Sequence, residues 1–104
     1  MSNQPISEEY RVVAKSWVDA EAAASMLEET KSAMLSQMMT KLGDMPVSRA
    51  EMQVKASDEW EDFIQKMVEA RQKANRLKVQ LEYIRMRASE WSSMEASKRA
   101  EMRL

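Results

Sequence analysis

The side chains in this chain that could do chemistry are carboxylates, thioethers and guanidinium groups. The chain has no His and no Cys, which removes the usual zinc ligands, the commonest general base and the thiol nucleophiles. Carboxylates gather at helical spacing in SDEWEDF, as Asp58, Glu59, Glu61 and Asp62. Only Glu59 and Asp62 match an E-x-x-D magnesium element, and the first half of the chain has no E-x-x-E to complete it. We expect a solvated acidic face, with no metal, no cofactor and no enzymatic activity.

Thioethers are abundant, with 11 methionines in 104 residues. A copper site needs soft ligands that converge on one point. Met34, Met38 and Met67 fall on predicted helix seams, and the others scatter along the chain. We therefore interpret the methionines as packing residues of the core or of a partner contact.

Cations concentrate in residues 71–87, which carry six Lys or Arg against one Glu although the net charge of the chain is −1. They could neutralise acids of the first arm, namely Glu8, Glu9, Asp19 and Glu21. They could instead contact phosphates, and such binding would be directed at the nucleic-acid backbone and sensitive to salt. The overall pI of about 5.6 favours neutralisation. The residues of this second interpretation are Arg71, Lys73, Arg76, Lys78, Arg85 and Arg87.

The elements that must position these side chains are helices. One Gly, two Pro and 32% charged residues predict a single all-α domain over residues 1–104. The breaker cluster LGDMPVS divides it into a first arm over about 6–42, a loop over 43–47 and a second arm over about 48–104. We expect Gly43 to end the first helix and Ser48 to begin the second in a capping box with Glu51, with Val47 and Met52 as a hydrophobic staple.

Apolar residues recur at steps of four and three in both arms, in the second from Ala56 to Trp91 without a miss. This pattern predicts a coiled coil. Because the loop is short, the arms should run antiparallel as a helical hairpin. Pairing outward from the loop places Val13 opposite Leu77 and Ala24 opposite Met67.

The second arm is longer, and about 20 residues from Ile84 onward should project past the first. A further stripe that includes Leu35, Met39, Ile64 and Val68 also needs cover. We therefore expect a homodimer that forms a four-helix bundle. The alternative is a break near residues 89–93 that folds a short third helix back; we favour the continuous helix.

The projecting segment contains the residues we expect to bind a protein partner. Trp91 lies beyond the first arm, where an exposed tryptophan can serve as a binding hot spot or as a base-stacking platform. No apolar run is long enough to span a membrane, and MSNQPISEEY lacks a signal-peptide pattern, so we expect a soluble cytoplasmic protein. The predicted partner-binding residues are Tyr83, Arg85, Arg87, Trp91 and Met94.

The segments LEYIRMRASEWSSMEASKRAEMRL and VKASDEWEDFI resemble small helical proteins of tailed bacteriophages and prophages, encoded in early gene clusters with recombination and replication functions. The resemblance covers about the second half of the chain and transfers no catalytic residue. It implies an accessory or host-modulating protein in the host bacterial cytoplasm that binds a host or phage nucleic-acid enzyme. The alternative function is a nucleic-acid-binding recombination or replication accessory that uses residues 71–87.

Overall fold

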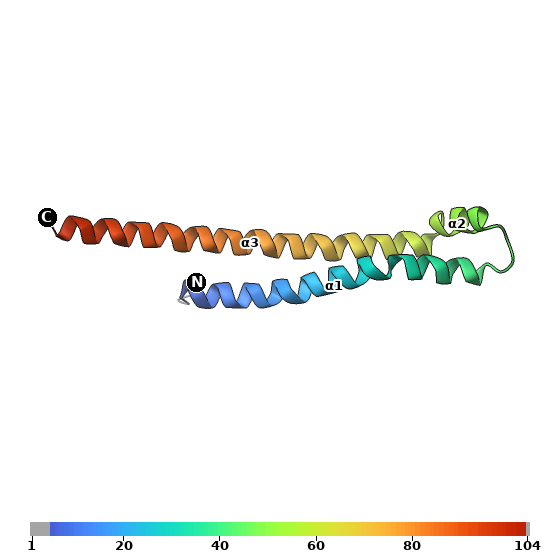
Figure 1. Cartoon of the computed structure of the whole chain (residues 1–104), viewed down its shortest axis with the longest axis horizontal. Helices are drawn as coiled ribbons and strands as arrows, with labels where there is room; N and C mark the ends of the chain where they lie inside the picture. The colour runs from blue at the N-terminus through green and yellow to red at the C-terminus, as the bar shows by residue number, and fades with distance from the viewer. Residues whose placement is uncertain (1–4, 104) are drawn as a thin grey trace.

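Three helices make up the part of the chain that the computed structural model describes, residues 5–103. They are α1 (Ile6–Lys41), α2 (Val47–Lys55) and α3 (Asp58–Met102). The molecule measures 84 × 22 × 18 Å, because α1 lies along α3 in the opposite direction and α2 sits at the turn (Figure 1). The all-α prediction is confirmed. The outermost residues of the predicted domain, 1–4 and 104, lie outside the described residues.

The first helix begins and ends where its sequence predicts. Pro5 is the N-cap residue with φ −60°, and its carbonyl accepts from the N–H groups of Glu8 and Glu9 at 3.0 and 3.1 Å. Gly43 has φ +84°, the left-handed conformation that suits a glycine just past a helix end. Its N–H donates to the carbonyl of Thr40 at 3.2 Å.

The predicted start of the second arm is wrong in two respects. Pro46 is the N-cap residue of α2 and makes no side-chain cap bond, so Ser48 lies inside the helix and the capping box with Glu51 does not form. Val47 and Met52 are both more than 70% exposed, so they make no buried staple. The physical reason is that proline has the fixed φ of a helix start, and its carbonyl accepts from Ala50 N–H at 3.0 Å.

The second arm is also two helices, because the chain breaks at Ala56 and Ser57 rather than near residues 89–93. Ser57 is the N-cap of α3: its hydroxyl accepts from Trp60 N–H at 3.2 Å and donates to the Val54 carbonyl at 2.6 Å. Ala56, the first residue of the predicted stripe, is exposed at this break. From Asp58 to Met102 the helix is continuous, as we favoured.

The seam between α1 and α3 is buried, with a register that differs from the predicted one. Val13 clusters with Leu81 and Ile84, and Ala24 clusters with Ala74. The buried partners of Val13 and Ala24 thus lie about one to two helical turns further along α3 than we predicted, and Leu77 packs at the edge of the Val13 cluster. The difference arises because α2 and its break lengthen the connection before α3 begins.

The turn end of the hairpin has its own core, built from Met38, Val54 and Trp60. The second apolar stripe contributes to it, since Leu35, Met39 and Ile64 pack against this cluster. Val68 remains 45% exposed. Part of this stripe is therefore covered within one chain, and the predicted homodimeric four-helix bundle stays a prediction.

The other end of the hairpin is open. Ile84 is only 1% exposed because Ile6, Tyr10 and Val13 cover it, so the projecting part of α3 starts later than predicted. It comprises about residues 92–102, which extend beyond the N-terminus of α1 (Figure 1). None of the helices in residues 5–103 is both long and apolar enough to cross a membrane.

Candidate functional site

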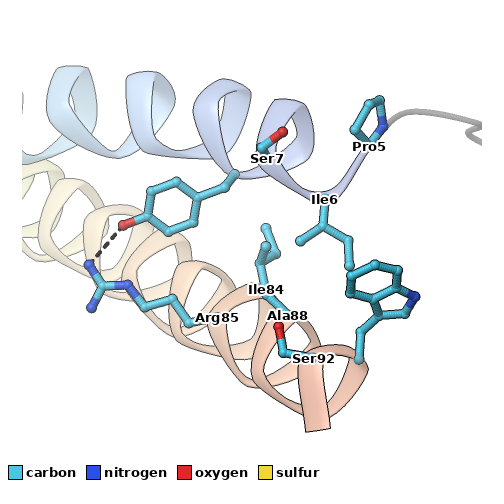
Figure 2. Close-up of a pocket in the computed structure, with 9 residues that line it drawn as sticks. Pro5, Ile6, Ser7, Ile84, Arg85, Ala88 and Ser92 are labelled. Atoms are coloured by element: carbon cyan, nitrogen blue, oxygen red, sulfur yellow. Dashed lines mark hydrogen bonds between the residues drawn. The ribbon is translucent and has the colours of Figure 1, made fainter. Parts of the chain in front are cut away.

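A groove of about 670 Å³ opens where α1 begins and α3 continues. Its α1 side is formed by Pro5, Ile6 and Ser7, and its α3 side includes Ile84 and Ala88. Ile6 and Ile84 extend toward each other across the groove (Figure 2). The complete lining is Pro5, Ile6, Ser7, Tyr10, Ile84, Arg85, Ala88, Trp91 and Ser92.

The groove exists because one of two packed helices ends. Along the seam each apolar side chain of α3 is covered by α1, but α1 begins at Ile6. The next seam positions of α3 are therefore only partly covered: Ala88 is half-buried and Trp91 is 58% exposed. An exposed tryptophan next to a buried isoleucine provides the large apolar surface that protein partners commonly use.

Arginines border this surface and are held by contacts with α1. Arg85 donates to the Tyr10 hydroxyl at 2.8 Å and stacks over the same ring, 5.5 Å from its centroid. Arg87 donates to Glu9 at 2.8 Å and lies 5.7 Å from the centroid of the Tyr83 ring. The hydrogen bond that Arg87 donates to Glu9 raises the pKa of the Arg87 guanidinium.

Arg71 makes a second link between the helices near the middle of the hairpin. It bonds to Glu28 through two nitrogens, at 2.7 and 2.8 Å, and also to Glu21. The bond from Arg71 lowers the pKa of the Glu28 carboxyl. The expected neutralisation of the basic stretch by first-arm acids is confirmed for Arg71 and Arg87, whereas Arg85 bonds to a tyrosine.

The remaining cations of the stretch are exposed. Lys73, Arg76 and Lys78 form no salt bridge with any carboxylate in residues 5–103. Helical periodicity places Lys78 on the same flank of α3 as Arg71 and Arg85, and Lys73 on the opposite flank with Arg87. The stretch therefore does not form one continuous basic face.

The predicted partner-binding residues divide between two places. Arg85 and Trp91 line the groove. Tyr83 and Met94 are about 60% exposed and lie outside its lining, as does Arg87. Sequence reasoning missed the α1 side, where Ile6 and Tyr10 are the first apolar residues of the stripe. That signal was present, but the predicted register placed these residues too far from Trp91.

The acidic cluster lies at the start of α3. Within the described part of the chain no three carboxylates come together as a metal-binding group. The cluster residues Asp58, Glu59 and Glu61 occupy the first turn of α3. The positive end of the helix dipole stabilises their negative charges there.

No protein-family model, curated protein or solved structure matches this chain. The resemblance to bacteriophage proteins is therefore carried by the sequence segments alone and remains a proposal.

Proposed function

We propose that this protein is a non-catalytic helical interaction module that binds a protein partner at the open end of its hairpin. The observation that carries this proposal is the apolar groove in which half-exposed Trp91 lies beside buried Ile84. Removing apolar surface from water is favourable, so a partner that covers the groove is stabilised by the apolar area that it buries. The chain has neither His nor Cys, which is consistent with a binding role.

The chemistry of the surface indicates how a partner would bind. An apolar side chain or a short amphipathic helix would enter the groove between Ile6 and Trp91, and acidic groups at its edge would meet Arg85. Arg85 is already oriented by Tyr10, so little side-chain freedom is lost on binding. The protein would then act by occluding or scaffolding its partner.

The phage resemblance supports one class of partner. We propose an accessory or host-modulating role in which the partner is a host or phage nucleic-acid enzyme. This assignment depends on the resemblance of the second half of the chain and on nothing in the groove itself.

Substitution of Trp91 tests the partner site. Immobilised protein would capture partners from a bacterial lysate, and the proteins retained by both the wild type and the control variant below would be scored. We expect Trp91→Ala to weaken capture by about 1–2 kcal/mol, or roughly 5- to 30-fold in affinity, with unchanged helicity by circular dichroism. Met52→Ala provides the matched control, because Met52 is 73% exposed at the opposite end. Equal capture by Trp91→Ala and wild type would contradict the proposal.

The alternative function is a nucleic-acid-binding accessory, and the observation in its favour is the exposure of Lys73, Arg76 and Lys78 without a carboxylate partner in residues 5–103. It receives less support because these cations point to different flanks of α3. It predicts gel shifts that weaken steeply with added salt and that diminish when all three are replaced by Gln. No shift at low salt, on single- or double-stranded substrates, would eliminate it.

A further inference from the structure

The projecting end of α3 has no neighbouring helix within residues 5–103. In residues 5–103, α1 provides no residue opposite α3 beyond the groove, because α1 begins at Ile6. Residues 92–102 nevertheless remain helical. Isolated helices of this length are marginal in water, so a neighbouring helix would stabilise this segment.

The seam pattern of α3 continues into this segment with a change of chemistry. Steps of four and three from Trp91 lead to Glu95, Lys98 and Met102, so the stripe becomes an acid, a base and then an apolar residue. Glu95 is half-buried while its neighbours on either side are exposed. Neither Glu95 nor Lys98 takes part in a salt bridge within the described part of the chain.

We propose that residues 91–102 are a self-association site whose occupant is the same segment of a second copy, packed in the antiparallel direction. In this arrangement Glu95 of each copy lies opposite Lys98 of the other, which gives two ion pairs at the centre. Trp91 of each copy lies opposite Met102 of the other, which gives an apolar layer at each end. Every group of the stripe then has a complementary partner.

Charge complementarity selects the direction. A parallel pair would place Glu95 against Glu95 and Lys98 against Lys98, and like charges that face each other across a helix interface are unfavourable. Only the antiparallel pair joins opposite charges. It is also self-complementary about a two-fold axis, as a closed homodimer requires.

The position of α1 fits the same arrangement. A second α3 that runs antiparallel to the first occupies the line that α1 follows, and it stops where α1 begins. Met102 of the second copy would therefore reach the groove beside Ile6 and Trp91, and its flexible thioether side chain suits an irregular apolar hollow.

The overlap is short, so the dimer should be reversible. About 12 residues at 1.5 Å each give a contact roughly 18 Å long. Two helices that touch over this length bury less surface area than a stable obligate dimer does. The resulting particle would be roughly 150 Å long, whereas the single chain is 84 Å long. A side-by-side bundle would instead stay near the length of one chain.

Charge exchange tests this pairing directly, with sedimentation equilibrium of the full chain as the measurement. We expect wild type to show a concentration-dependent dimer. Glu95→Lys alone and Lys98→Glu alone should each weaken it at least tenfold, because every central pair becomes a like-charge pair. The double variant Glu95→Lys/Lys98→Glu should restore dimerisation, since both pairs form again with their signs exchanged.

Mixing the two single variants sharpens the test. In a mixed dimer, the lysine introduced at position 95 meets the glutamate introduced at position 98, and the other layer keeps its native pair. We expect the mixture to dimerise although neither variant does so alone, with helicity unchanged. Small-angle X-ray scattering of the wild-type dimer should give the elongated particle.

Three outcomes would overturn the inference: a wild type that stays monomeric up to millimolar concentration, a dimer that ignores the charge changes, or single variants that remain monomeric when mixed. The inference does not depend on the proposed protein partner. The charge variants keep Trp91, so the two proposals can fail separately. A dimer that ignores the charge changes, with capture that depends on Trp91, contradicts only this inference; a charge-dependent dimer, with capture that does not depend on Trp91, contradicts only the proposed function.

Discussion

At the scale of single residues, Arg71 connects the two long helices most extensively. It bonds to Glu21 and Glu28 on α1, and its side chain is 29% exposed. Arginine suits this position because its planar group can bond two carboxylates at once. Exposed pairs add little to stability individually, so their main effect is to fix direction and register.

The Glu28 pair gives the stability of the hairpin a predictable pH dependence. Arg71 lowers the pKa of Glu28 in the folded chain, so this pair stabilises the fold above the ordinary glutamate pKa and ceases to do so as the pH falls through the lowered value. We expect Glu28→Gln to reduce stability slightly near neutral pH and to match wild type in strong acid, as measured by urea unfolding. Glu29→Gln is the control, since Glu29 has no ion pair in residues 5–103. An equal loss at both pH values would contradict the assignment.

Gly43 provides a second test at this scale. Its φ of +84° is unfavourable for any side chain, although a Cβ there would meet nothing within 4 Å. We expect Gly43→Ala to destabilise the fold by about 1–2 kcal/mol in thermal or urea unfolding. Gly43→Asn should cost less, because asparagine tolerates this conformation better. A neutral Gly43→Ala would show that the turn does not need the left-handed backbone.

At the scale of elements, the sequence predicts the two long helices better than it predicts the helix boundaries between them. Gly43 and the first-arm boundaries are readable because a glycine after a helix has one dominant use. The break at Ala56 and Ser57 is hidden, because no Gly or Pro marks it in the sequence. Ser48 has the side chain that is preferred at an N-cap, but Pro46 is the N-cap residue of α2, two residues earlier.

The two serines can be compared experimentally. Ser57 caps α3 by accepting from Trp60 N–H, whereas Ser48 lies exposed inside α2. We expect Ser57→Ala to cost about 1 kcal/mol of unfolding free energy and Ser48→Ala to have almost no effect, with both measured by urea unfolding. The opposite order would restore the predicted capping box and contradict the break.

At the scale of the whole molecule, the hairpin has one closed end and one open end. The Met38, Val54 and Trp60 cluster closes the turn, and α3 extends past the start of α1 at the other end of the hairpin (Figure 1). Trp91 could be identified from the sequence because the arms differ in length. Ile6 and the rest of the α1 wall could not, because their contact with α3 depends on a register that the hidden break displaces.

Cross-linking can show whether the chain doubles back so that α1 begins beside residues 88–92 of α3. The chain has no native Cys, and Ser7 and Ser92 line the same groove (Figure 2). We expect the variant Ser7→Cys/Ser92→Cys, treated at high dilution with a short bis-maleimide, to cross-link within one chain in high yield. The variant Ser7→Cys/Gln65→Cys, whose second site lies near the start of α3, should not cross-link. Efficient linkage of the second variant and none of the first would contradict the antiparallel hairpin.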